Sequence, residues 1–232
     1  EAMAVKQYGY AEDVAGLTPE SAAASYETML STAAVEITMI GNSAGPAVAE
    51  IFRETFEKAL EHRSRTPITP DFDVEQKLPE QVRRVTEEMD LTQGKMVLGF
   101  TIQPAEETRL LAVSRIASAV YGASPFSKLF MNVREKLSLC YYCASRIAGN
   151  SGFMLVDCGI ESSNQQKAEA EILRQLDEVR AGNFTETELA NAKLSAVNAL
   201  RAITDSLSAM ETWLLNEILL GGDSADPTDE ID

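Results

Sequence analysis

The stretch Ser124-Pro-Phe-Ser-Lys-Leu-Phe-Met-Asn-Val-Arg-Glu-Lys-Leu-Ser-Leu-Cys-Tyr-Tyr142 decides the fold, because it carries the chain from a helix directly into a strand. Residues 127–136 are predicted to form a short helix. Alternating apolar residues then predict a strand over 140–147, paired with a strand over 153–160. The turn between them is Gly149-Asn-Ser-Gly152, a composition typical of a hairpin connection.

The rest of the chain adds helices and strands on both sides of this stretch. Helices are expected at about 18–30, 47–62, 105–121, 164–181 and 185–203, and strands at 34–40, 81–88 and 94–101. Residues 66–80 contain three prolines without hydrophobic periodicity, which predicts a linker. The acidic tail, 223–232, is expected to be frayed. The order αβα, linker, ββαββαα favours an α+β fold, with an antiparallel-rich sheet and helices packed on one face.

Composition restricts the possible functions. The 232 residues carry a formal net charge of -16, which disfavours binding to nucleic acid or to an anionic membrane. No apolar run approaches 18 residues, so no membrane span is expected. The sequence begins Glu1-Ala-Met-Ala, with neither an initiator methionine nor a visible signal peptide. We therefore expect a piece of a longer, cytoplasmic protein.

The three cysteines, Cys140, Cys143 and Cys158, lie in strand-like apolar runs. Free buried thiols are the simplest interpretation of an odd number of cysteines in a reducing compartment. Cys140 and Cys143 form a C-x-x-C, but no second pair or nearby histidine completes a zinc site. A redox C-x-x-C belongs at the N-terminus of a helix, so its position in a strand argues against that role as well.

Four segments, in the right order, resemble the insulinase/pitrilysin-like zinc metallopeptidases, which include the mitochondrial processing peptidases. The segments are residues 17–41, 87–100, 124–142 and 184–193, and the resemblance extends over about residues 8–221. The chain is most similar to the non-zinc-binding, C-terminal-type portion of bacterial paired processing-peptidase-like proteins, some of which lack the catalytic motif. The family usually has glycine where Ser138 stands.

The family's zinc motif, H-x-x-E-H, is absent from this sequence. The only histidine is His62, and Lys58 occupies the place of the first histidine of the motif. Glu61-His62 is interpreted as an exposed helix C-terminus, where a histidine is favourably placed against the helix dipole. The sequence therefore predicts no metal ligand and no catalytic residue in this chain alone, with zinc only in a partner domain or subunit.

The resemblance implies a role for Arg134 and Tyr141, the pair that in the family reaches across to a zinc site on another domain. Arginine suits a peptide carboxylate or carbonyl, and the tyrosine hydroxyl suits an oxyanion. The alternative from the residues alone is that Arg134 pairs with Glu135 and that Tyr141 is half-buried in a strand. Tyr142 is expected on the opposite face, in the core.

The resemblance also implies a domain organisation. Residues 1–65 correspond to the end of a first family domain, 66–80 to the linker, 81–222 to most of a second domain and 223–232 to the tail. Because both family domains share a fold, the first αβα is expected either to complete the second domain in permuted order or to be exchanged between two copies in a swapped homodimer. In the permuted packing, residues 34–40 pair with a strand of their own chain. If they pair with nothing in that chain, the permuted packing is wrong.

Two functions follow. The first is a substrate-binding, zinc-free portion of a metallopeptidase that processes peptides or proteins, in which Arg134 and Tyr141 complete a zinc site borne by a family domain or subunit. The second is a catalytically inactive scaffold or partner subunit of the same fold. The expected partners are that zinc-bearing domain or subunit and a peptide substrate.

Overall fold

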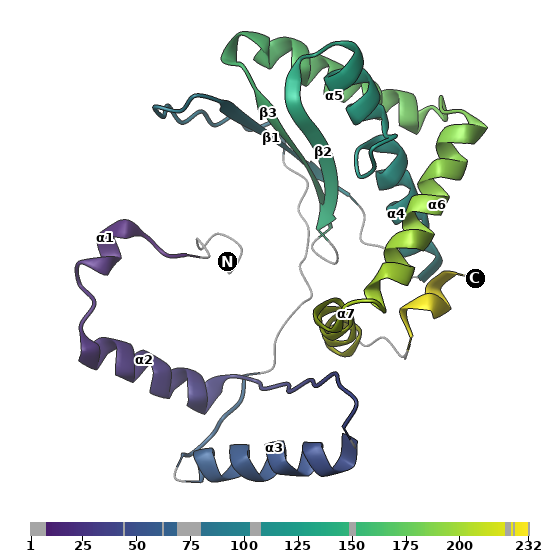
Figure 1. Ribbon diagram of the computed structural model, residues 1–232. Helices are drawn as coiled ribbons and strands as arrows, with labels where there is room; N and C mark the ends of the chain where they lie inside the picture. Colours follow the sequence, from purple (N-terminus) through teal and green to yellow (C-terminus); the bar gives the residue numbers. More distant parts are fainter. Residues whose placement is uncertain are drawn as a thin grey trace. The chain divides into compact units, whose positions relative to one another are not determined.

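The fold consists of two compact units, Glu1–Asp71 and Phe72–Asp232 (Figure 1). The computed structural model describes residues 8–43, 45–61, 63–68, 80–102, 108–148, 152–220, 224 and 226–231. The boundary between the units falls within the predicted linker, 66–80, most of which, like His62, lies outside the described residues. Each unit is described by itself.

The described residues of the first unit form three helices. They are α1 (Ala11–Val14), α2 (Pro19–Thr32) and α3 (Gly45–Leu60). The predicted N-cap is confirmed, because the Thr18 hydroxyl accepts from the Ser21 N–H at 3.1 Å. At the other end of α2, Arg65 donates to the carbonyl oxygens of Leu30 and Ala33, which have no partner within the helix.

The strand predicted at residues 34–40 does not form. Val35, Ile37 and Met39 alternate as expected, but the described sheet contains only strands of the second unit. A strand is maintained by the hydrogen bonds of a neighbour, and the alternation of side chains does not supply them. The permuted packing required this segment to pair within its own chain and is therefore not supported; exchange between two copies stays a proposal.

The second unit contains an antiparallel sheet of three strands, in the order β1-β3-β2. The strands are β1 (Gly94–Thr101), β2 (Cys140–Ala148) and β3 (Phe153–Ile160). All three were predicted, β1 and β3 with the observed bounds. The prediction of a further strand at 81–88 is wrong, since Val82 and Val85 are 82% and 93% exposed and belong to no ladder.

The described part of the second unit also contains five helices and two short 3₁₀ turns. They are α4 (Thr108–Tyr121), a π-helix (Leu129–Lys136), α5 (Gln165–Arg180), α6 (Glu186–Ile203) and α7 (Leu207–Leu220), with turns at Ser162–Asn164 and Pro227–Ile231. The predicted capping box of α6 is confirmed, with Thr185 and Glu188 exchanging hydrogen bonds. The tail is not frayed at Pro227, which is fully buried.

The core lies on one face of the sheet, as predicted, between the strands and the helices α4, α5 and the π-helix (Figure 1). Its most buried members include Val133, Val156 and Ile172, with none of their surface exposed. A second cluster joins α4 to α6 through Val120 and Ala192. In the described part of the chain, no helix has the length and apolar character needed to cross a membrane.

Candidate functional site

The π-helix Leu129–Lys136 carries Arg134 near its end. The sequence predicts a helix here but not its wider winding, which is seen where the Leu137 N–H donates to the Asn132 carbonyl, five residues back, at 3.2 Å. Asn132 is held in turn by Gln175 of α5, at 3.0 Å. π-helical turns are rare and concentrate at functional sites, so this element marks the region as a candidate.

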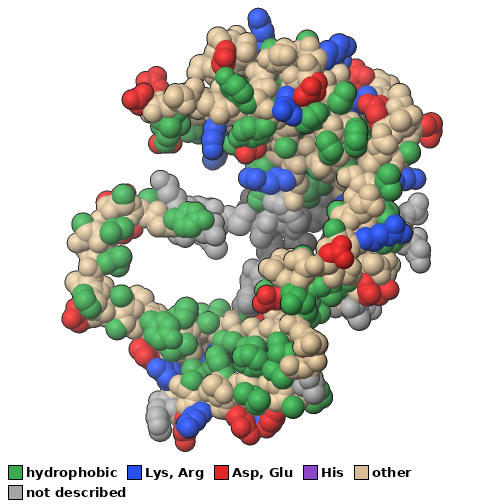
Figure 2. Space-filling model, viewed as in Figure 1, with side chains coloured by type: hydrophobic (Ala, Val, Ile, Leu, Met, Phe, Trp, Pro, Cys, Tyr) green, Lys and Arg blue, Asp and Glu red, His purple; other side chains and the backbone are tan. Residues whose placement is uncertain are grey.

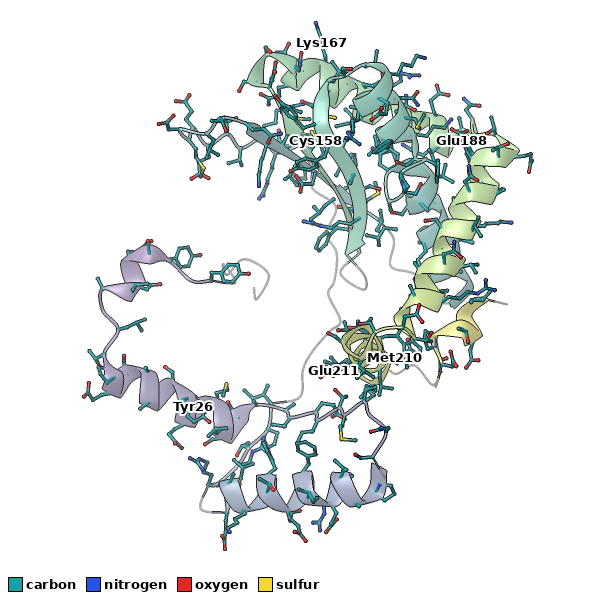
Figure 3. All side chains as sticks on the ribbon, in the orientation of Figure 1. Tyr26, Cys158, Lys167, Glu188, Met210 and Glu211 are labelled. Atoms are coloured by element: carbon teal, nitrogen blue, oxygen red, sulfur yellow. The ribbon has the colours of Figure 1, made fainter. Side chains whose placement is uncertain are left out.

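A salt bridge ties the start of this helix to α6. Lys128 Nζ lies 2.9 Å from a carboxylate oxygen of Glu188, which Figure 3 labels in the first turn of α6. Burial on its own raises the pKa of Glu188, but hydrogen bonds from Thr185 and Lys128 outweigh it and leave the pKa below its ordinary value. The π-helix is thus fixed to α6 through Lys128 and to α5 through Asn132.

Arg134 is held at the surface by two contacts. Its guanidinium lies 4.6 Å from the centre of the Phe130 ring, an arrangement that favours a cation over an aromatic face. Its Nη1 is 3.6 Å from Glu135 Oε1, so the local pairing considered for this arginine is present. Both side chains are substantially exposed, 40% and 50%, so this pair contributes little stability and leaves Arg134 available to a ligand.

Ser138 forms the bend between the π-helix and β2. Its φ is 50°, and it is the one non-glycine residue with a positive φ among those the structure describes. The bend is closed by the Ser138 N–H, which donates to the Arg134 carbonyl at 3.0 Å. The left-handed region costs a non-glycine residue about 1–2 kcal/mol. Serine therefore keeps the bend but leaves its backbone strained. The bend lies between Arg134 and Tyr141 and so sets how far apart these two residues are.

A β-bulge places Tyr141. In the register of β2 with β3, Cys140 lies opposite Ile160 and Tyr142 opposite Gly159, so Tyr141 has no partner between them. Tyr141 is 59% exposed rather than half-buried, and its hydroxyl donates to Glu161 Oε1 at 3.4 Å.

The bulge also explains why the prediction of Tyr142 in the core is wrong. Tyr142 lies on the sheet face opposite the core, where its exposed fraction is 36% and its hydroxyl donates to Asp157 Oδ1 at 3.0 Å. Its ring occupies the space above Gly159, because a Cβ added there would lie 2.5 Å from Tyr142 Cε1. Only a glycine at position 159 leaves room for the Tyr142 ring in this position.

Arg134 and Tyr141 line the same pocket, of about 420 Å³. The remaining lining residues come from the bend, the start of β2 and the end of β3: Glu135, Ser138, Leu139, Cys140, Glu161 and Asn164. Glu161 was not predicted as a site residue, although the hairpin register places the residue after Ile160 beside the start of β2. One guanidinium, one phenol and two carboxylates give the pocket groups that can bind a peptide backbone.

The described residues do not form a zinc site. Among them, no group of three or more histidine, cysteine, aspartate or glutamate side chains is arranged to hold a metal ion. In the pocket, the two carboxylates of Glu135 and Glu161 lie near the positive charge of Arg134, which would repel a metal cation.

Relatives support a common fold. YmfF of Bacillus subtilis, described as a probable inactive metalloprotease, is 27% identical over 209 residues, covering 90% of this chain and 48% of YmfF. The solved structure of a conserved protein from Enterococcus faecalis has a TM-score of 0.77 and 26% identity, over 98% of this chain and 56% of that one. A protease from Helicobacter pylori has a TM-score of 0.65 and 15% identity, covering 96% of this chain and 54% of its own.

The chain thus spans about half the length of these relatives, and within that half both its units are matched. The family described as the peptidase M16 inactive domain matches residues 16–195, from the start of α2 into α6. This range includes the π-helix, the bend at Ser138 and the bulge at Tyr141. The pocket that these elements build is therefore part of a recognised domain, and the chain belongs to the peptidase M16 inactive-domain family.

Proposed function

We propose that this chain is the metal-free, substrate-binding half of an M16-type metallopeptidase that processes peptides or proteins. The observation that carries the proposal is that Arg134 and Tyr141, which lie seven residues apart in the sequence, line one pocket. They do so through three local features, the π-helix, the bend and the bulge. Each of these departs from regular structure, and such departures are usually kept only where a site needs them.

The two side chains suit different parts of a bound peptide. Arg134 offers a permanent charge and a planar fork of donors to a carboxylate or backbone carbonyl. The Tyr141 hydroxyl can donate to an oxyanion that forms at a scissile carbonyl, and its bond to Glu161, at 3.4 Å, is long enough to be exchanged for one to substrate. The proposal places the zinc ion, and the water it activates, in a partner domain or subunit.

The first unit supplies an argument for such a partner. None of the described residues before Ile68 is buried. A groove of about 520 Å³ is lined by apolar side chains of α3 and of the segment before it, including Val35, Ile37, Phe52 and Phe56. Figure 2 shows hydrophobic side chains gathered on this unit. With no fully buried apolar side chain, a unit of this size has little to offset its conformational entropy, so we propose that a zinc-bearing family domain or subunit covers the groove.

The full-length protein that contains this chain tests the proposal through Tyr141→Phe, which removes one hydroxyl. Loss of one oxyanion donor lowers kcat by roughly 10²–10³-fold. Tyr142→Phe is the matched control, because it removes a hydroxyl from the next residue, on the other sheet face, and is expected to leave kcat unchanged. Peptide hydrolysis is measured for the protein alone and mixed with a zinc-bearing family member of the same organism. Equal activity of both variants and the unchanged protein would refute the role of Tyr141.

A second candidate is a catalytically inactive scaffold or partner subunit in the cytoplasm. The large apolar face of the first unit favours it, and so does the description of YmfF as a probable inactive metalloprotease. Under this proposal, neither the full-length protein nor its mixtures contain stoichiometric zinc or hydrolyse peptides. Sedimentation of the same samples would show whether the face is covered by a second copy or by a different subunit.

A further inference from the structure

The bulge at Tyr141 brings three thiols to one face of the sheet. In a regular strand, residues three apart point to opposite faces, so Cys140 and Cys143 would be separated. One unpaired residue between them reverses this: Cys140 lies opposite Ile160 and Cys143 opposite Cys158, all on the core face. Figure 3 labels Cys158 on the sheet. The bulge therefore places the two thiols of the C-x-x-C side by side, as a helix N-terminus would in the usual redox motif.

The three thiols differ in access. Cys140 is partly exposed and lines the pocket that contains Arg134, whereas Cys143 and Cys158 are 4% and 0% exposed. A small molecule that enters the pocket therefore meets Cys140 first. Cys143 lies on the same sheet face, directly opposite Cys158, and is hydrogen-bonded to both of the other thiols.

The surroundings shift the pKa values of Cys140 and Cys143 in opposite directions. A hydrogen bond from the Cys143 thiol lowers the pKa of Cys140; burial opposes this, and the positive charge of Arg134 adds to it. The hydrogen bonds with Cys140 and Cys158, together with burial, raise the pKa of Cys143. Cys140 is thus the thiol with the lower pKa of the two, and it is also the one that the pocket exposes.

We propose that Cys140 is an oxidant-sensitive thiol that reacts with small hydroperoxides, and that Cys143 is its resolving thiol. The Cys140 thiolate attacks the outer oxygen of the hydroperoxide, which breaks the O–O bond and releases an alkoxide, or hydroxide from hydrogen peroxide; Cys140 becomes a sulfenic acid. The Cys143 sulfur then attacks the Cys140 sulfur. Its proton leaves with the departing hydroxide as water, and a disulfide forms. An accessible, acidified thiol beside a resolving thiol is the arrangement that this chemistry needs.

Closing this disulfide has a consequence for Tyr141, which lies between the two cysteines. A disulfide usually joins Cα atoms about 5.5–6 Å apart, whereas Cys140 and Cys143 lie opposite Ile160 and Cys158, two residues of β3 that span about 7 Å. The bulge must therefore tighten when the bond closes, and Tyr141 moves with it. Oxidation at Cys140 would in this way change the shape of the pocket.

The test treats the 232-residue chain with hydrogen peroxide, followed by alkylation and peptide mass spectrometry. A Cys140–Cys143 disulfide is expected. In Cys143→Ala the sulfenic acid on Cys140 should persist and be trapped by a 1,3-dione probe, and in Cys140→Ala no oxidation is expected at the same dose. Cys158→Ala is the matched control, since it also removes a buried thiol but should still form the Cys140–Cys143 bond.

A second measurement separates a reactive thiol from one that is merely accessible. Arg134→Gln should slow the alkylation of Cys140 by iodoacetamide several-fold at neutral pH, while Arg134→Lys, which keeps the charge, should restore the rate. Trp213 fluorescence verifies that each variant is folded. An unmodified Cys140 after peroxide, a disulfide between Cys143 and Cys158, or equal alkylation rates in the two Arg134 variants would overturn the proposal.

Discussion

Replacing Gly122 by alanine should destabilise the second unit, because the new methyl group would meet backbone as well as side-chain atoms. Gly122 follows α4 and lies between the first residue of the π-helix and the middle of β2. A Cβ at this position would lie 2.7 Å from Leu129 Cδ1 and 2.7 Å from the backbone nitrogen of Ser145. The Leu129 side chain can rotate away, but the nitrogen belongs to β2 and can retreat only if the strand moves.

The magnitude follows from two contributions. Forcing a methyl group into a packed core costs about 1–3 kcal/mol. The strand movement also weakens the hydrogen bond in which the Ser145 N–H donates to the Gly122 carbonyl, now 3.1 Å, at a further cost of about 1 kcal/mol. We therefore expect the free energy of unfolding to fall by roughly 2–4 kcal/mol, with each kcal/mol lowering Tm by about 2–4 °C.

The assay is urea unfolding followed by tryptophan fluorescence. The single tryptophan, Trp213, is 8% exposed in α7, so its signal reports on the second unit. Gly99→Ala is the matched control: a Cβ there meets Leu155 Cδ2 at 3.7 Å, an ordinary contact, and should change the free energy of unfolding by less than about 0.5 kcal/mol. Equal unfolding midpoints for the two variants would refute the steric argument.

Two further predictions concern the bend and α6. Ser138→Gly removes the cost of a left-handed φ, although glycine also gains entropy in the unfolded chain. The net effect should be a rise of about 0.5–1 kcal/mol in the free energy of unfolding, measured in the same urea assay. A loss of stability would contradict the strain at this residue. Burial raises the pKa of Glu188, but hydrogen bonds from Thr185 and Lys128 leave it below 4.5, so the stabilisation it provides is present above pH 4.5 and lost as the pH falls further. Unfolding midpoints measured from pH 7 downward should therefore decline less steeply in Glu188→Gln, and parallel curves would argue against this carboxylate as the source of the decline.

The elements predicted best are those whose signals are local. The bounds of β1 and β3 follow from alternation bounded by glycine, and α6 begins at its capping box because Thr185 and Glu188 satisfy free N–H groups at its start. Ala168 and Ile172 of α5 are fully buried, as their helical spacing predicts. In each case the information lies within a few residues, so no distant partner has to be known.

The missed features depend on partners distant in the sequence. Residues 34–40 and 81–88 have strand-like patterns, but nothing local reveals whether a neighbouring strand exists. The bulge at Tyr141 is a property of the register between β2 and β3. The sheet face on which Cys140 and Tyr142 lie could therefore not be deduced from alternation alone. The pocket residues Arg134 and Tyr141 came from resemblance, whereas Glu161 emerged only once the hairpin register was known.

The unpaired segment of the first unit has a consequence for handling the protein. Val35-Glu-Ile-Thr-Met-Ile40 is short, rich in β-branched residues and free of proline, with one charge, and Val35, Ile37 and Met39 are 38–46% exposed. Such segments template cross-β stacking when they are not covered. A net charge of -16 keeps molecules apart at low ionic strength, but salt screens that repulsion. Preparations of this chain should therefore aggregate through this segment as salt is added, and a lysine in place of Ile37 should prevent it.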